Sequence, residues 1–356
     1  MARWDHESVG VTDRLVDRRP AASAAELAAR FEPPKRFAGV RFDNFLPDPA
    51  HPSQADAKVA LEGFARSFGG NSAEAGRSGG WFGRRSSSPL SSTGDDGRPG
   101  RYLDGGFGVG KTHLLASLWH AAPAPKSYLS FEELTAFIGF VGMASATKTF
   151  AGHRLVCIDE FELDDVANTR MSVTFLRAVI ARGTKLAATS NAIPDRLGEG
   201  RFNAEDFERE LLEIGSHWDV LRLDGPDYRA TSRPSRTAAL SPGEVERLAS
   251  RGGTATLDDF DDLLAHLRHV HPVQYAPMLD DLDTALVQGL HSIENQGSAL
   301  LFVQLVDELY DRGVVFGATG CDVTELFPSS YRNGGYRKKY GRCESRLGAM
   351  LGEASS

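Results

Sequence analysis

The sequence predicts an α/β fold, in which helices flank a parallel β-sheet. Two short runs, Leu155–Ile158 and Leu186–Thr189, have the length and mostly apolar composition of strands buried on both faces of such a sheet. A helical pattern over residues 165–181 lies between them, and Gly183 follows it as a helix-ending residue. A further short strand, expected over residues 101–104, is followed by a glycine-rich turn and a second helical pattern. Strands that alternate with helices in this way are typical of a parallel sheet.

The glycine-rich turn fits the pattern G-x-x-x-x-G-K-[ST]. In this pattern, backbone N–H groups and the start of the helix hold phosphates, the lysine reaches the β- and γ-phosphate oxygens, and the threonine hydroxyl binds Mg²⁺. A flexible linker that happens to contain Gly-Lys-Thr is the alternative, and the flanking strand and helix argue against it. The sequence therefore predicts a P-loop NTPase, whose expected nucleotide-binding residues are Gly105, Gly106, Phe107, Gly108, Val109, Gly110, Lys111, Thr112 and His113.

Two acids, Asp159 and Glu160, follow the buried run that ends at Ile158. Open α/β sheets bind ligands at the carboxyl ends of their strands, so we expect this pair to lie beside the phosphate loop. Asp159, together with Thr112, is the predicted Mg²⁺ ligand, and Glu160 is the predicted group that polarises the attacking water. Without the upstream phosphate loop, an apolar run before Asp-Glu would indicate only a solvated strand end.

A polar tip follows the next expected strand, where Thr189 and Ser190 precede Asn191. The amide of Asn191 is suited to hydrogen-bond the attacking water or the γ-phosphate without adding charge, which is the role of a sensor residue. A plain turn residue is the alternative for an Asn in this position. No N-K-x-D sequence, which would read guanine, follows this strand. The pattern therefore favours ATP over GTP.

Composition limits the class of partner. The chain has 356 residues and a net charge of −8, which argues against a protein that mainly coats nucleic acid or an anionic membrane. No apolar run approaches the length of a transmembrane segment. The 3 cysteines are odd in number and lack C-x-x-C spacing, so a reducing cytoplasm is the expected location.

The expected organisation is an N-terminal arm at residues 1–40, a helical lead-in at 41–68, a flexible Gly/Ser-rich insertion at 69–100, the P-loop ATPase core at 101–232 and a C-terminal region at 233–356. The lead-in helix is expected to bury one side, which carries Val59, Leu61, Phe64 and Phe68.

Two segments share one local pattern. Phe175–Leu197 and Phe302–Leu326 each show a helix, an Arg-Gly turn, a buried strand and an Ala-Thr pair. From this similarity we expect that residues 301–327 return to the ATPase sheet or to its edge.

Taken together, several motifs resemble the ZapE-like cell-division ATPase family, a branch of the AAA+ class. They are LDGGFGVGKTHLL, LVCIDEFELDDVAN, KLAATSNAIPDRL, LDGPDYR, LVDELYDRGVVFGATG and GGYRKKYGRCESRL, preceded by HPSQA at residues 51–55. The resemblance covers most of residues 40–350. It implies a Mg²⁺-dependent ATPase in which Lys111 and Thr112 bind nucleotide, Asp159 and Glu160 serve the metal and the water, and Asn191 is the first sensor.

The resemblance also implies catalytic arginines. An arginine that reaches into a neighbouring subunit is expected after the first sensor, and Arg201 is the favoured candidate, followed by Arg209. Arg346 is the candidate for the second sensor, with Arg342 as the alternative.

The favoured function is ATP hydrolysis that drives mechanical remodelling of a protein partner. By resemblance, this partner is a tubulin-like division protein or a membrane-associated client, and the chain assembles into a ring or nucleotide-dependent oligomer. The alternative is a nucleic-acid ATPase of the helicase-loader type. The basic segment Arg332–Arg342, which contains Tyr336 and Tyr340, is compatible with that alternative, although the acidic chain makes nucleic acid the minority interpretation. A scaffold without ATPase activity is disfavoured because the nucleotide and acidic residues are all present.

Overall fold

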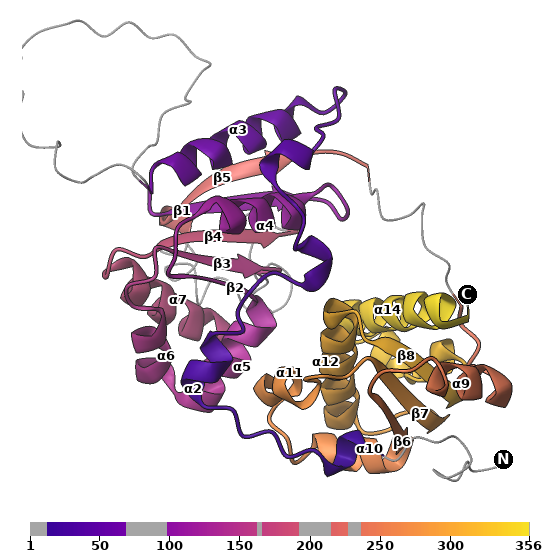
Figure 1. Ribbon diagram of the computed structural model, residues 1–356. Coiled ribbons are helices and arrows are strands. Elements are labelled where there is room, and N and C mark those ends of the chain that lie inside the picture. Colours follow the sequence, from indigo (N-terminus) through magenta and orange to yellow (C-terminus); the bar gives the residue numbers. More distant parts are fainter. Residues whose placement is uncertain (1–12, 69–97, 162–165, 192–214, 227–235, 356) are drawn as a thin grey trace, which may run out of the picture.

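The computed structural model describes residues 13–68, 98–161, 166–191, 215–226 and 236–355, and it contains two separate sheets (Figure 1). The first sheet has five parallel strands in the spatial order β2-β3-β4-β1-β5. Their bounds are β1 Gly100–Gly105, β2 Lys126–Ser130, β3 Leu155–Asp159, β4 Lys185–Ser190 and β5 Trp218–Leu223. The parallel sheet predicted from the buried runs is confirmed, and the phosphate loop follows its strand β1.

Helices cover both faces of the first sheet. α3 (Pro52–Arg66) and α4 (Lys111–Ala121) pack on one face, while α5 (Phe131–Val141), α6 (Met143–Phe150) and α7 (Val166–Ile180) pack on the other (Figure 1). One expected core residue is wrong: Val59 is 50% exposed. The buried stripe of this helix runs through Ala57, Leu61 and Phe64, whose spacing of four and three residues follows the helical repeat and leaves Val59 on another face. Phe68, just beyond the end of the helix, is buried as expected.

The second sheet lies in the C-terminal region and has three parallel strands in the order β6-β7-β8. These strands are β6 Ala255–Asp259, β7 Thr284–Leu290 and β8 Val315–Gly320. The helices around it are α9 Pro242–Ala249, α10 Phe260–Leu267, α11 Tyr275–Met278, α12 Gln296–Arg312, α13 Ser329–Arg332 and α14 Arg337–Ser355, with two 3₁₀ turns, η7 Pro272–Gln274 and η8 Val323–Glu325. We call this sheet with its helices the C-terminal unit, and the first sheet with its helices the ATPase unit.

The expectation that residues 301–327 return to the ATPase sheet is wrong. The two similar segments do form matching pieces, α7–β4 and α12–β8, and a glycine with positive φ follows the helix in each. However, β8 pairs with β7, and Phe302, Val306 and Phe316 are buried in the core of the C-terminal unit. The pattern is local, and it specifies a helix packed against a strand without specifying which sheet receives the strand.

The N-terminal segment contacts both units (Figure 1). Its first turn, η1 (Leu15–Asp17), packs on β6, and Leu15 is 1% exposed. The buried carboxylate of Asp258 accepts hydrogen bonds from the backbone N–H groups of Leu15 and Val16. Further along, α2 (Ala24–Ala28) packs on α6, and η2 (Lys35–Phe37) contacts α12. The segment therefore ties the two units together along the chain.

Within the described residues, no helix combines the length and the apolar character needed to cross a membrane.

Leu15→Ala should destabilise the C-terminal unit, because it removes a fully buried side chain from the core of that unit. We expect the free energy of unfolding to fall by about 2–4 kcal/mol. Equilibrium urea denaturation followed by circular dichroism measures this change. Leu46→Ala is the control, since Leu46 is 85% exposed. Equal effects of the two substitutions would show that η1 is not docked.

Candidate active site

The phosphate loop joins the end of β1 to the start of α4. Gly108 and Gly110 have φ values of 69° and 96°, which are left-handed conformations that favour glycine. Space is restrictive as well: a Cβ atom on Gly105 would lie 2.3 Å from the carbonyl oxygen of Leu223, and one on Gly110 would lie 2.6 Å from the ring of Phe45. Glycine is therefore required at Gly105 and Gly110. The loop forms a backbone cradle of the kind that holds phosphates.

The ammonium group of Lys111 lies at the centre of this cradle. Its Nζ donates hydrogen bonds to the carbonyl oxygens of Gly105 at 2.8 Å and Gly106 at 2.6 Å, and to Oδ1 of Asn191 at 3.0 Å. The predicted sensor Asn191, at the end of β4, thus lies directly beside the predicted nucleotide-binding lysine. The two apolar side chains of the loop differ in burial: Phe107 is 56% exposed, whereas Val109 is buried.

His113, the last of the expected nucleotide-binding residues, lines the same pocket as the phosphate loop and also contacts the N-terminal segment. Its Nε2 lies 3.0 Å from Oδ1 of Asn44 in η3 (Phe42–Asn44) and 3.3 Å from the carbonyl oxygen of Arg41. Burial lowers the pKa of His113. Its contacts indicate that it fastens the N-terminal segment to α4.

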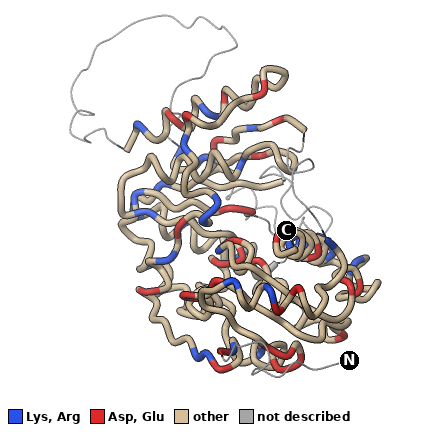
Figure 2. The backbone as a smooth tube through the Cα atoms, turned by 45° about the vertical axis from the view of Figure 1, so that its right-hand side comes forward, with Lys and Arg blue, Asp and Glu red and all other residues tan. Residues whose placement is uncertain are grey.

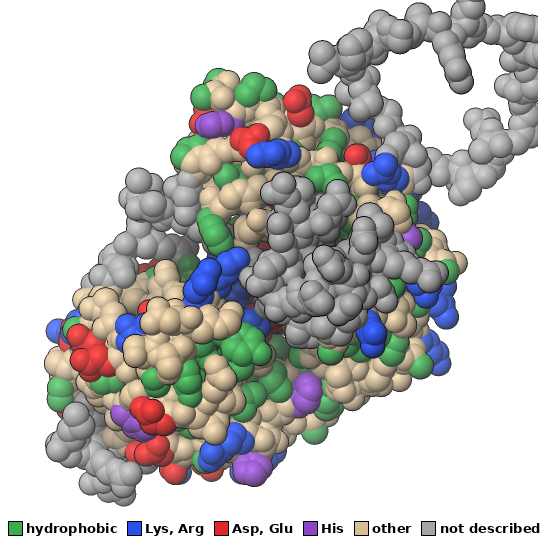
Figure 3. Space-filling model, turned by 180° about the vertical axis from the view of Figure 1, so that it is seen from behind, with side chains coloured by type: hydrophobic (Ala, Val, Ile, Leu, Met, Phe, Trp, Pro, Cys, Tyr) green, Lys and Arg blue, Asp and Glu red, His purple; other side chains and the backbone are tan. Residues whose placement is uncertain are grey.

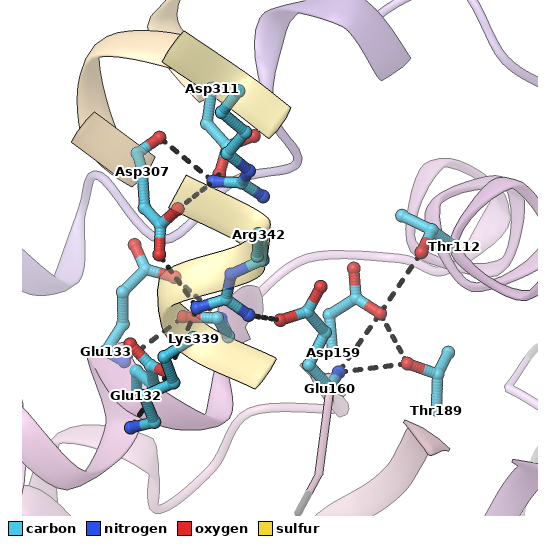
Figure 4. Close-up of polar contacts among 12 residues, drawn as sticks. Thr112, Glu132, Glu133, Asp159, Glu160, Thr189, Asp307, Asp311, Lys339 and Arg342 are labelled. Atoms are coloured by element: carbon cyan, nitrogen blue, oxygen red, sulfur yellow. Dashed lines mark hydrogen bonds and ion pairs between the residues drawn. The ribbon is translucent and has the colours of Figure 1, made fainter. Parts of the chain in front are cut away.

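Asp159 ends β3 and lies opposite the start of α4. Its Oδ1 accepts hydrogen bonds from Thr112 Oγ1 at 3.3 Å, from the Glu160 N–H at 3.2 Å and from Thr189 Oγ1 (Figure 4). Its Oδ2 accepts one from Tyr128 OH at 2.8 Å. The Thr112 hydroxyl and the Asp159 carboxylate are hard oxygen donors, which Mg²⁺ prefers. The donor set at this edge of the sheet therefore fits the metal that the sequence predicts.

Glu160 follows Asp159 in a conformation that non-glycine residues rarely adopt. Its φ is 54°, and its backbone N–H also donates to Thr189 Oγ1 at 3.0 Å. Such strain is kept where the surrounding structure fixes it, often at functional sites. Burial raises the pKa of Glu160, although Arg342 opposes that shift.

The side chain of Glu160 pairs with an arginine from the C-terminal unit. Arg342, on the second turn of α14, donates from Nη1 to Glu160, and from Nη2 to Asp307 at 2.7 Å and Glu132 at 3.1 Å (Figure 4). Lys339 contacts Glu132 as well, at 3.1 Å. Figure 2 shows acidic and basic residues side by side where the two units meet.

Arg346, the first candidate for the second sensor, lies one turn further along α14. Its Nη1 contacts Asp307 at 2.8 Å and Asp311 at 3.3 Å, and its guanidinium lies over the ring of Tyr310. The arginine that reaches Glu160 is instead the alternative candidate, Arg342.

Two candidates cannot be placed, since Arg201 and Arg209 lie outside the described residues. Tyr128 and Glu132 were not predicted from the sequence, because nothing local marks a tyrosine in β2 or an acid at the start of α5 as part of a site formed with β3 and α14.

A second carboxyl group of α5 lies close to this network. Glu133 caps its own helix: Oε2 accepts from the Ser130 N–H at 2.6 Å, and the Glu133 N–H donates to Ser130 Oγ at 3.1 Å. Burial, with the nearby charges of Glu308 and Asp311, raises the pKa of Glu133 to about 8. This carboxyl group is therefore protonated at neutral pH.

The cradle, the lysine, the strand-end acids and the polar tip of β4, on a parallel sheet flanked by helices, define a P-loop ATPase of the AAA+ type. The model of the AFG1-like ATPase family matches residues 22–249 and 244–354, and the chain belongs to this family. The chain is thus an ATPase by family, as the resemblance in its motifs predicted.

The chain is also similar to curated relatives and to solved structures. The chain is 28% identical over 297 residues to Cell division protein ZapE of Escherichia coli (strain K12), which covers 71% of this chain and 78% of the relative. A protein of the same name from Escherichia coli O157:H7 gives the same values. Among solved structures, the match to DnaI covers 55% of this chain and 93% of the DnaI chain, at 16% identity and a TM-score of 0.40. The match to a katanin structure covers 92% of this chain and 98% of the katanin chain, at 14% identity and a TM-score of 0.34.

Glu133→Gln should flatten the dependence of stability on pH. Between about pH 5 and 8 the unfolded chain has an ionised Glu133 while the folded protein keeps it protonated, so the folded state binds more protons and the free energy of unfolding falls as the pH rises. Glutamine preserves the helix cap and removes this titration. Urea denaturation at pH 5, 6.5 and 8 measures the effect.

The control is Glu26→Gln, which changes the same capping position in α2. Ser23 lowers the pKa of Glu26, and Glu26 is exposed, so its replacement should leave the decline in stability between pH 5 and 8 in place. An unchanged decline in Glu133→Gln would contradict the protonation of Glu133.

Proposed function

We propose that this chain is a Mg²⁺-dependent ATPase that converts ATP and water to ADP and phosphate and uses the energy to remodel a protein partner. The observation that carries this proposal is the meeting of Thr112, Asp159 and Glu160 beside the phosphate loop. Mg²⁺ bound at this edge would neutralise charge on the phosphate oxygens. Lys111 would then donate to the β- and γ-phosphate oxygens rather than to the loop carbonyls.

Glu160 is proposed to accept the proton of the attacking water. Burial raises the pKa of Glu160, which makes its carboxylate a stronger base. Asn191 is close enough to Lys111 to orient the water or the γ-phosphate. Because Arg342 now holds the Glu160 carboxylate, that carboxylate must turn away from Arg342 to serve the water. We therefore assign the second sensor role to Arg342, with Arg346 supporting it through their shared partner Asp307.

The proposed setting is cell division in the cytoplasm. The name of the curated relative supports cell division, and the 3 cysteines, all free thiols, are those of a chain from a reducing compartment. The proposed client is a tubulin-like division protein or a membrane-associated protein. A nucleotide-dependent oligomer, in which Arg201 or Arg209 of one subunit reaches the next, is part of the same proposal.

One observation favours a nucleic-acid ATPase as a second candidate. Tyr336, Arg337 and Lys338, at the start of α14, are exposed, and Figure 3 shows Lys and Arg side chains gathered beside the boundary between the units. An exposed ring between cations can stack on a base and neutralise phosphates.

ATP turnover per chain should rise with protein concentration, as expected for an ATPase that works as an oligomer. It should fall roughly 10²–10⁴-fold in Glu160→Gln, because this substitution removes the general base and keeps the phosphate cradle. Phosphate release, measured with and without a polymerising tubulin-like division protein, tests this expectation. Loss of turnover in Arg201→Ala but not in Arg209→Ala would identify the arginine that acts across the subunit interface.

The matched control is Glu246→Gln, on an exposed position of α9, which should keep wild-type turnover. Stimulation by single-stranded DNA that declines steeply with salt, without stimulation by the division protein, would favour the nucleic-acid candidate. Absence of turnover in the wild-type chain at every concentration would overturn the proposal.

A further inference from the structure

Tyr128 lies in the middle of β2, one strand away from the acids of the active site. In the sheet, β2 pairs with β3, and Tyr128 is opposite Cys157. Tyr128 is only 3% exposed and belongs to the core between the sheet and α4. Its hydroxyl nevertheless reaches the end of the neighbouring strand, where it donates to Oδ2 of Asp159 at 2.8 Å.

The hydrogen bonds of Asp159 differ between its two oxygens. Oδ1 accepts from Thr112, Thr189 and the Glu160 N–H, and it faces the phosphate loop. Oδ2 accepts from Tyr128 on the side of β2. Because donors on both oxygens fix the plane of a carboxylate, rotation of the Asp159 side chain would break the bond to Tyr128.

We propose that Tyr128 is a positioning residue, which holds the Asp159 carboxylate in the orientation that directs it toward Thr112 and a bound Mg²⁺. This inference rests on the Mg²⁺-dependent function proposed above. Tyrosine suits the task, since its ring fills the core while its hydroxyl supplies the donor. A tyrosine hydroxyl is protonated at neutral pH, so it can donate to the carboxylate.

A purely structural role is the alternative, in which Tyr128 only fills space under α4. Tyr128→Phe separates the two roles, because it keeps the ring and removes the donor. Residues that orient metal ligands typically change metal affinity about 10–100-fold when they are replaced. A structural defect would weaken nucleotide binding with or without metal, whereas a positioning defect affects only the part that depends on the metal.

The experiment measures the affinity of the full chain for a non-hydrolysable ATP analogue by isothermal titration calorimetry, in EDTA and across a series of Mg²⁺ concentrations. We expect Tyr128→Phe to bind the analogue as the wild type does in EDTA, and to require roughly tenfold more Mg²⁺ for the same gain in affinity. Tyr275→Phe is the matched control, since Tyr275 is also buried, and its hydroxyl bonds the carbonyl oxygen of Leu267 in the C-terminal unit, away from Asp159.

Equal Mg²⁺ requirements in Tyr128→Phe and the wild type would overturn the inference, and so would an equal loss of affinity in EDTA and in Mg²⁺. A second measurement adds Tyr128→Phe to Asp159→Asn. No further change is expected if Tyr128 acts through Asp159, and an additive loss would contradict this. A wild-type chain that binds the analogue without any gain from Mg²⁺ would overturn the proposed function itself, which distinguishes that failure from a failure of Tyr128 alone.

Discussion

The ion pair between Arg342 and Glu160 is the contact on which the arrangement of the active site depends. Arg342 brings one guanidinium to carboxylates from three different elements: Glu160 after β3, Glu132 in α5 and Asp307 in α12. Burial opposes the charge of Arg342, but these carboxylates outweigh it and raise its pKa. Because its side chain is only 27% exposed, removing it would leave partly buried acids without a counter-charge. The position of α14 and the orientation of the predicted general base are therefore linked.

Through this linkage, the C-terminal unit contributes a side chain, Arg342, to the surroundings of Glu160. The N-terminal segment strengthens it, since η1 packs on β6, α2 packs on α6 and His113 holds η3 against α4. Two of the carboxylates that face Arg342 belong to the ATPase unit and one belongs to the C-terminal unit. A movement of α14 would consequently change the surroundings of Glu160 directly, which is how chemistry at one site can be converted into motion of another part of the chain.

The sequence predicted the phosphate loop, the acid pair and the central strands because each is a local pattern with a fixed physical requirement. Gly110 needs a left-handed φ, and the run Leu155–Ile158 must be buried on both faces. The second sheet could not be predicted in this way, because the pattern of Phe302–Leu326 specifies a helix and a strand but not their sheet. Tyr128 was missed for a related reason: its role depends on which strand lies beside β3. Arg342 could be named from the motif of α14, but only the packing of α14 on the ATPase unit separates it from Arg346.

The coupling between Arg342 and Glu160 is the most direct test of this account. A double-mutant cycle with Arg342→Met and Glu160→Gln, measured as the free energy of unfolding in urea, isolates the interaction of the two side chains from their separate effects. We predict a coupling free energy of at least about 1 kcal/mol, since the two side chains are in direct contact and are 27% and 39% exposed. Single effects that add to within about 0.5 kcal/mol would contradict this prediction, and would show that the C-terminal unit does not hold the Glu160 side chain.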